Sequence, residues 1–496
     1  MPRLTLDTSG PARVEIRDAE GVMHRPDAAI ADTTASDRPG VVDMDLDPGD
    51  ASGVLPFYAG HFLSSGIADL ELPSGDYQVI VEKGTEFERW SESIRLTGDA
   101  TVGAVPRRWV HMAAQDWWSA DFHLHRPFDQ AREILLAEDL NIGVFFTQWS
   151  GDGLAHSGSR PPDGARSLVV HADATHIGLG ANTEDERGGG AWMLHGCLDP
   201  AALSGSTWWH PPGPTAVARA REAGAWIDCE KLTWWETPVV MALCPPDSVG
   251  VLNNHYAQYG MFANEAWGRP RDRARYPGPR GFSDYQLDLY YRYLNCGFRL
   301  PASAGSASGV LPVPPGYNRV YVHVPPPFTV DRFYERLRAG RSFVTNGPML
   351  SFSIDGRMPG EIAPIGHAPV RFAVQAESPE PIERIEVVAN GRVVAAGPGT
   401  ALDGELDLSG FSWVAARCYL AHPVTIRLAH TSPVYLNGTG TGWDSTADRA
   451  YLADWVDELV ALTRGDPGRF ESREQRLAVL RVYQEALRSY RRPGEV

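Results

Sequence analysis

The stretch SADFHLHRPFDQAREILLAEDLNIGVFFTQW, residues 119–149, indicates an α/β layer. It begins with a short apolar run that ends in polar residues, SADFHLHRP, and closes with a second apolar run, NIGVFFTQW. Between them, Ile134, Leu135, Leu136 and Leu140 recur at helical spacing. Strand, helix and strand in this order are typical of an α/β sheet or barrel, where polar residues at strand carboxyl ends line the active site.

Two histidines stand at the end of the first run, in Asp121-Phe122-His123-Leu124-His125. Residues i and i+2 of a strand point to the same side, so both imidazoles can reach one metal ion. Imidazole suits Zn, Fe, Mn and related ions. An isolated pair of this kind is as often two histidines on a solvated strand edge, and the apolar α/β context favours the metal site.

The alternation of predicted strands and helices continues to about residue 328. TAVARAREAG is expected to be a helix, AWIDCE a strand, and YQLDLYYRYLNCG a helix. Residues 107–328 are therefore predicted to form one α/β domain.

Both flanks alternate apolar and polar residues instead, as in ARVEIRD and YQVIVEKG before the α/β domain and VRFAVQAES after it. We expect a β-sandwich at residues 1–106 and a second one at 329–445, which begins with a connecting helix. Residues 446–496 are expected to be a helical tail, whose apolar positions pack on a neighbouring domain or subunit.

Composition excludes several classes of protein. The net charge of −17 repels phosphate backbones, so nucleic acid is not an expected partner. The five cysteines form no CxxC pair, which argues against a disulfide framework or zinc ribbon and favours the cytoplasm. There is no signal-like N-terminus and no run of 18 apolar residues, so neither a leader nor a membrane span is expected.

Several segments together resemble a known family. DFHLHRP with the helix ending in AEDLNIG is similar to the first motif of the PHP (polymerase and histidinol phosphatase) superfamily, and more closely to its CehA/McbA-like, carbaryl-hydrolase-like branch. The resemblance runs from about residue 55 to the end of the chain. It is carried further by ANTEDERGGG, VLNNHYAQYGMFANEAWGRPRDRARYPGP, YLNCGFRLPASAGSASGVLPVPPGYNRVYV, LRAGRSFVTNGPML and AHTSPVYL.

The resemblance implies a fold and a ligand set. The fold would be a multidomain α/β plus β protein, with a PHP-type distorted (β/α)7 barrel between two β-sandwiches and a C-terminal helix. The metal ligands would be His123, His125 and Glu184, with Glu186 as the alternative to Glu184 if the register differs. His255, at the end of an apolar run, is a fourth expected ligand, although a buried histidine with one hydrogen bond would look the same in sequence.

The chain departs from this family pattern at two places. Ala307 stands where many members carry Asp, and Asp228-Cys229-Glu230-Lys231 replaces a histidine-rich strand end. The expected cofactor is therefore one divalent transition metal ion (Zn, Mn or Fe).

Further residues are candidates for catalysis or for binding a substrate. His195, Asp228 and Glu230 could move a proton. Arg126 and Arg319 could hold a carboxylate or phosphate, although a structural ion pair is as common a use. Trp235 and Asn254 are expected near the substrate, in surroundings that also contain Trp149, Trp192 and Trp234, although core packing is the commoner role of a tryptophan.

These patterns predict a metal-dependent hydrolase that acts on an ester, carbamate, amide or phosphoester bond of a small molecule. Two alternatives remain open: a metal-dependent lyase or isomerase on a carbohydrate-like or natural-product substrate, and a non-catalytic binding or scaffold protein. A homo-oligomer is compatible with the sequence, through the helical tail or a sandwich edge.

Overall fold

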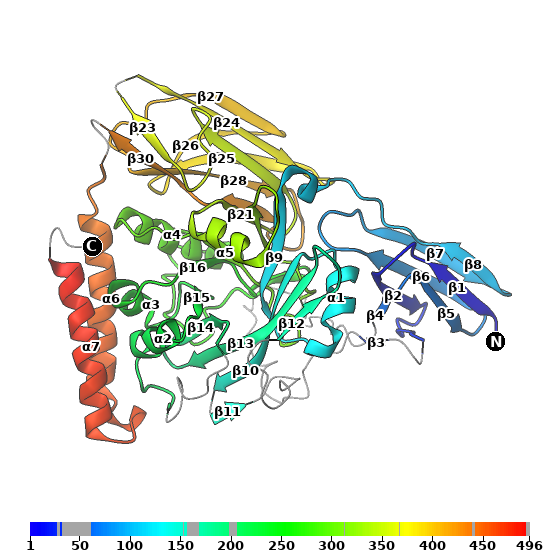
Figure 1. Ribbon diagram of the computed structural model, residues 1–496, viewed down its shortest axis with the longest axis horizontal. Coiled ribbons are helices and arrows are strands. Elements are labelled where there is room, and N and C mark those ends of the chain that lie inside the picture. The colour runs from blue at the N-terminus through cyan, green and yellow to red at the C-terminus, as the bar shows by residue number, and fades with distance from the viewer. Residues whose placement is uncertain are drawn as a thin grey trace.

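The computed structural model describes residues 1–26, 30–31, 61–151, 153–155, 168–197, 206–311, 313–366, 368–438 and 442–492. It is a mixed α/β protein with β-rich parts on either side of the α/β part. Figure 1 shows these parts in chain order, from the blue strands at the N-terminus through the cyan and green centre to the yellow and orange sheets. A pair of long helices, orange and red, lies along the outer side of the central part.

The N-terminal part consists of two sheets that share one apolar core. The sheets have the strand orders β5-β1-β8 and β3-β4-β2-β6-β7. The alternation in ARVEIRD and YQVIVEKG corresponds to β2 and β6, and it places Val14, Ile16, Val79 and Val81 in this core. The strands are β1 (Arg3–Asp7), β2 (Ala12–Asp18), β3 (Ile30–Ala31), β4 (Phe62–Ser64), β5 (Ile67–Glu71), β6 (Gly75–Glu82), β7 (Trp90–Leu96) and β8 (Ala100–Gly103).

The central part contains a ring of strands. Its members are β9 (Trp117–Leu124), β10 (Ile142–Gly151), β13 (Ile177–Arg187), β14 (Gly190–His195), β15 (Trp226–Cys229), β16 (Ser248–Leu252) and β19 (Ala302–Ala304). Neighbours pair in parallel, except that β14 is antiparallel to both β13 and β15. The ring closes after β19, where Ser308 pairs in parallel with Leu124 and its carbonyl accepts from the His125 amide at 2.8 Å. The carboxyl ends of the parallel strands therefore meet at one mouth.

Helices and shorter strands surround the ring. Ile134 and Leu135 of the first helix pack on Leu124 and Phe145, as the helical spacing predicts. The helices are α1 (Ala131–Ala137), α2 (Gly213–Glu222), α3 (Thr237–Leu243), α4 (Gly281–Asn295) and α5 (Val330–Arg338), with 3-10 turns η1 (Met112–Gln115) and η2 (Phe128–Gln130). The additional strands are β11 (Gly153–Ala155), β12 (Val169–His171), β17 (Tyr256–Ala257), β18 (Gly260–Met261), β20 (Arg319–His323) and β21 (Ser342–Thr345).

The C-terminal β part is continuous with the central part through backbone pairing. β20 pairs with β9 and with β21, and β21 pairs in turn with β29. Two groups of strands, β22-β24-β27 on one side and β26-β25-β28 with β29, β30 and β23 on the other, enclose a second apolar core. These strands are β22 (Met349–Ile354), β23 (Ile362–Ile365), β24 (Val370–Glu377), β25 (Ile382–Ala389), β26 (Arg392–Gly397), β27 (Ala401–Leu406), β28 (Trp413–Leu420), β29 (Leu428–Thr431) and β30 (Val434–Gly438).

The tail forms two helices where the sequence predicted one helical segment. α6 (Thr446–Gly465) and α7 (Arg473–Arg491) flank the 3-10 turn η4 (Pro467–Arg469). Pro467 lies two residues after the end of α6, where a proline cannot continue the helix. α7 is fastened to the central part: Tyr483 donates to Glu236, and Tyr490 donates to the carbonyl of Pro238 at 2.7 Å. In the described part of the chain, no helix is long and apolar enough to cross a membrane.

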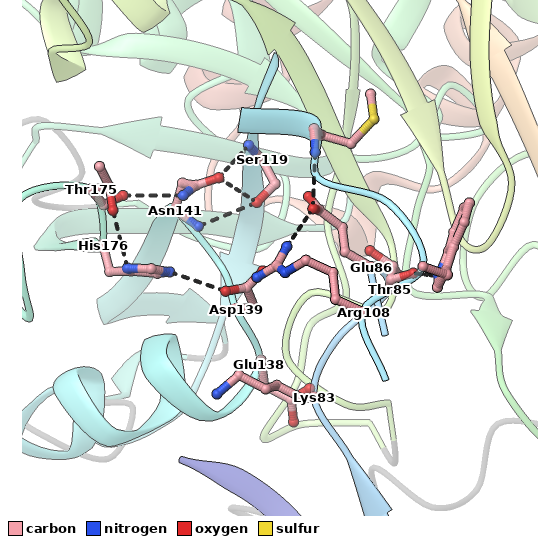
Figure 2. A network of polar contacts seen from close by, with 12 residues as sticks. Lys83, Thr85, Glu86, Arg108, Ser119, Glu138, Asp139, Asn141, Thr175 and His176 are labelled. Atoms are coloured by element: carbon pink, nitrogen blue, oxygen red, sulfur yellow. Dashed lines mark hydrogen bonds and ion pairs between the residues drawn. The ribbon is translucent and has the colours of Figure 1, made fainter. Parts of the chain in front are cut away.

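A polar network joins the N-terminal part to the amino ends of the ring strands (Figure 2). Arg108 lies 2.7 Å from Glu86 and 2.8 Å from Asp139. Asp139 lies 3.7 Å from the imidazole of His176, which hydrogen-bonds Asp173 at 2.8 Å. Because His176 directly precedes β13 and Asp139 precedes β10, this network lies at the end of the ring opposite the mouth and serves stability.

We expect His176 to make stability depend on pH. Burial lowers the pKa of its imidazole, but Asp139 and Asp173 outweigh burial and the pKa is raised. A raised folded pKa contributes stability that is complete below the unfolded pKa of about 6.5 and is lost as pH rises through the folded value. Lys83 and Arg108 also face Asp139. Burial alone would raise the pKa of Asp139, but its charged partners lower it to about 2. The interaction of protonated His176 with the two aspartates contributes about 1 kcal/mol to the free energy of unfolding.

The measurement is urea unfolding of the native chain and of His176→Gln between about pH 6 and pH 8.5. The variant should be less stable than the native chain mainly at the acidic end, so the two stability curves should converge as pH rises. His111→Gln, at an exposed histidine, is the control. Parallel curves for the native chain and His176→Gln would contradict this assignment.

Candidate metal centre

The mouth of the ring gathers the polar residues that follow or end its strands. β9 supplies His123 and, one residue after its end, His125. β13 supplies Glu184, which pairs with Trp149 of β10 and with Met193 of β14. His123, His125 and Glu184 have exposed fractions of 3%, 2% and 2%, although each carries a polar or charged group. Such burial requires partners or a bound ion.

Three ligand atoms of these residues form a compact triangle. Nε2 of His123 lies 2.9 Å from Nε2 of His125. Oε2 of Glu184 lies 2.8 Å from Nε2 of His125 and 3.5 Å from Nε2 of His123. Two ligands that each bind an ion at about 2.1 Å are roughly 3.0–3.4 Å apart, from octahedral to tetrahedral angles. The triangle therefore has the size that three ligands of one transition metal ion have.

The charges of the triangle support one another. Burial acts to lower the pKa of His123, but Glu184 and Glu230 outweigh it, so the pKa is raised. Burial alone would raise the pKa of Glu184, but the two histidines outweigh burial, so the pKa of this carboxyl is lowered. Glu184 is therefore a carboxylate, which is the form that binds a metal ion.

Glu230 lies behind His123, on the side away from the triangle. Its Oε1 is 3.7 Å from Nδ1 of His123, whereas Nε2 of the same ring faces Glu184. A carboxylate on the far nitrogen of a metal-binding histidine orients the ring and raises its basicity. At 3.7 Å the Glu230 carboxylate makes no hydrogen bond to His123, so this residue, which the sequence offered for proton transfer, acts on the ring through its charge.

Asp228 is the second-to-last residue of β15, two residues before Glu230, and is also buried. Ser248 and Ser303 both donate to its Oδ1. Burial raises the pKa of Asp228 to about 6, and the charge of Glu230 adds to this effect. A carboxyl with this pKa can exchange a proton near neutral pH.

Asp121 holds the site together from below, a role that the sequence analysis did not assign. It is fully buried, and it accepts from the amide of His123 and the amide of Ser306 at 3.0 Å each, from the amide of Gly316 at 2.7 Å, and from the hydroxyl of Ser306. Burial raises the pKa of Asp121, and these four donors act in the opposite direction. The spacing Asp121, His123, His125 was the available signal, since alternate residues share one side of a strand.

The loop after β19 must come very close to β9. A Cβ atom added to Gly305 would lie 2.5 Å from Cβ of His123, which no side chain tolerates. This loop contains Ala307, where the family resemblance suggests Asp, and it supplies hydroxyls instead. Ser306 donates to Asp121, and Ser308 accepts from Nε of Arg126 at 2.9 Å.

Glu184 lies within β13 and not at its end. β13 continues to Arg187 because it pairs with β14 as a hairpin, with Glu184 opposite Met193 and Arg187 opposite Gly190. Glu186, the alternative ligand, therefore shares the side of Glu184. Burial raises the pKa of Glu186, and the charges of Glu184 and Glu230 add to it.

The two other candidate histidines lie outside the triangle. Among the described residues, the group whose ligand atoms lie within 4.8 Å of one another is His123, His125 and Glu184. His255 is fully buried, and its ring stacks on Phe282 at 4.6 Å between centroids. Nδ1 of His195 lies 3.1 Å from the hydroxyl of Tyr334. Burial and the nearby His123 lower the pKa of His195 to about 3, so its ring is neutral.

The expected substrate-binding residues fall in different places. Arg319 is fully buried and donates to the backbone carbonyls of Gly316, Asp139 and Glu138, which is a structural role. Arg126 directly follows His125 and is 3% exposed. Asn254 follows β16 and is 8% exposed, and Trp235 packs half-buried on the central core.

Aromatic rings from β10 line the histidines. Phe146 lies 5.5 Å from His123 and 5.9 Å from His125 between ring centroids, and Trp149 lies 5.1 Å from His125. Trp192 and Trp234, in contrast, are buried in the central core. Of the tryptophans considered in the sequence, Trp149 thus has the position closest to that expected of a site residue.

Comparisons with protein-family models, with curated proteins and with solved structures gave no match for this chain.

Proposed function

We propose that this protein is a metal-dependent hydrolase with one divalent transition metal ion held by His123, His125 and Glu184. The observation that carries the proposal is the triangle of Nε2, Nε2 and Oε2 atoms, with sides of 2.9, 2.8 and 3.5 Å, in a fully buried setting. Two imidazoles and one carboxylate leave further positions on an ion open, as in catalytic rather than structural zinc sites. The ring with one reversed strand and the sequence motifs support a relationship to the PHP superfamily and its carbaryl-hydrolase-like branch.

An ion in this place would polarise a carbonyl or phosphoryl oxygen and make water reactive near neutral pH. The surrounding residues would support the ion, transfer protons and exclude water. Glu230 places its charge 3.7 Å from Nδ1 of His123, and Asp228, with its pKa of about 6, is suited to take up and return a proton. Phe146 and Trp149 exclude water from one side of the histidines. The substrate class that fits is a small molecule with an ester, carbamate, amide or phosphoester bond.

The test compares the native protein with His123→Ala/His125→Ala, both purified without chelator, by elemental mass spectrometry. We expect about one transition metal ion per chain in the native protein and background content in the variant. His111→Ala/His171→Ala, at two exposed histidines, is the matched control and should keep the ion. Metal-loaded native protein should then hydrolyse at least one member of a phosphoester, ester and carbamate panel, and the double variant none. A native protein that binds no metal after reconstitution would contradict the proposal.

A further inference from the structure

The tight turn between β13 and β14 packs against a buried carboxylate. Gly188 and Gly189 form this turn, and β13 before it carries Glu184 of the metal triangle. The amide of Glu236 donates to the carbonyl of Gly189 at 2.9 Å, and a Cβ atom added to Gly189 would lie 2.2 Å from Oε2 of Glu236. The turn has no room for a side chain at this position, so Glu236 fixes the tip of the hairpin.

The side chain of Glu236 joins the turn to two other segments. Its Oε2 accepts from the amide of Gly213, the first residue of α2, at 2.6 Å, and its Oε1 accepts from the hydroxyl of Tyr483 on α7. Glu236 is 4% exposed and Tyr483 is fully buried. A buried carboxylate with a donor on each oxygen keeps its orientation, because a rotation would leave those donors unpaired.

A second route leads from the same carboxylate to the residue beside Glu184. Arg187, the last residue of β13, donates through Nη2 to Asp185 at 2.7 Å and through Nη1 to the carbonyl of Pro211 at 2.7 Å. Pro211 lies two residues before the start of α2, where Glu236 binds the chain. Successive residues of a strand point to opposite sides, so this buried ion pair holds β13 from the side away from the metal ligand.

We propose that Tyr483 is a positioning residue of the metal centre, which acts through Glu236 on the hairpin that carries Glu184. The inference rests on the proposed metal site and gives the C-terminal helix a role in it beyond packing. The pairing of β13 with β14 runs without a register shift from the turn to Glu184, which lies opposite Met193. A shift of the turn therefore reaches the metal ligand, since rigid elements and hydrogen-bond networks carry coupling between distant points.

The same helix provides a matched control. Tyr490 of α7 is also buried, and its hydroxyl donates to the carbonyl of Pro238 at 2.7 Å. Pro238 belongs to α3 and, among the contacts of the described residues, has no hydrogen bond to the hairpin. Tyr483→Phe and Tyr490→Phe each remove one buried hydroxyl from α7 and keep the ring. Both should cost a similar amount of stability, and only Tyr483→Phe should affect the metal.

The experiment titrates Co²⁺ into the native protein and both variants, with the visible absorption of the bound ion as the readout of its ligand geometry. Tyr483→Phe should lower Co²⁺ affinity roughly 5-fold, the equivalent of one lost hydrogen bond, and should change the intensity of the Co²⁺ bands. Tyr490→Phe should keep the native spectrum and an affinity within about 2-fold of native. Urea unfolding of the metal-free proteins checks that the two variants lose similar stability.

A double-mutant cycle tests the route through the carboxylate. Glu236→Leu removes both acceptor oxygens and should lower Co²⁺ affinity by roughly 10–100-fold. Tyr483→Phe should have no further effect on affinity in that background, because the hydroxyl has lost the group through which it acts. Native affinity and spectrum in Tyr483→Phe, or an equal change in Tyr490→Phe, would overturn the inference. A native protein that binds no Co²⁺ would instead contradict the proposed function itself, so the two failures are distinguishable.

Discussion

Asp121→Ala is expected to lower the free energy of unfolding by about 4 kcal/mol or more, since each buried donor left without an acceptor costs about 1–3 kcal/mol. Four donors lose their acceptor at once: the amides of His123, Ser306 and Gly316, and the hydroxyl of Ser306. The same change releases β9 from the loop that closes the ring, so His123 and His125 lose their fixed positions. Metal affinity should fall by roughly 10–100-fold, as for other residues that support metal ligands.

Chemical denaturation and metal titration of the same samples measure both effects. Asp121→Asn, which keeps the shape and one acceptor oxygen, should lie between Asp121→Ala and the native protein. Asp129→Ala, at an exposed aspartate four residues after His125, should change stability by no more than about 0.5 kcal/mol. A stable Asp121→Ala protein with native metal affinity would show that Asp121 is not the support described here.

Glu184→Gln is expected to reduce metal affinity by about 1,000-fold, or about 4 kcal/mol, and to abolish metal-dependent turnover. The amide keeps the volume of the carboxylate but lacks its charge, and it stands 2.8 Å from Nε2 of His125 in a site that excludes water. The carboxylate is thus the one negative ligand of the triangle, and its removal should affect the ion more than any change around the histidines.

The neighbouring carboxyl provides the matched control. Glu186 lies two residues later on the same side of β13, with a raised pKa, but outside the group of closely spaced ligand atoms. Glu186→Gln should retain the ion, with affinity within about 10-fold of native. If Glu186→Gln loses the ion and Glu184→Gln keeps it, the ligand assignment along β13 is wrong by two residues.

Local sequence patterns predicted a large part of this architecture. The i, i+2 rule placed His123 and His125 on one side of a strand, and alternation located the β segments on both flanks. The break in the tail was not predicted, although Gly465, Pro467 and Gly468, which occur together where α6 ends, are a local signal for it. These features depend on a few neighbouring residues, so no knowledge of the rest of the chain is needed.

The remaining features depend on contacts between distant segments. Glu184 lies inside a hairpin because β14 extends the pairing, which the run ANTEDERGGG does not reveal. His255 follows an apolar strand like a ligand, yet the ring of Phe282 from α4 packs against it. Glu230, which follows β15, comes within 3.7 Å of His123 on β9, and spacing along the chain carries no information about that distance.

The backbone pairing of β21 with β29 has a consequence for dissecting this protein. Ser432, directly after β29, accepts from the amide of Ala302 at 2.9 Å and lies 2.8 Å from the hydroxyl of Ser342. Ala302 begins β19, the last strand of the ring, so the C-terminal part supplies a hydrogen-bond acceptor to the ring. A chain cut after Thr345 would present β21 as a bare sheet edge prone to self-association. Proteolysis or truncation should therefore not release an independently folded central part, and both parts should unfold as a single cooperative unit.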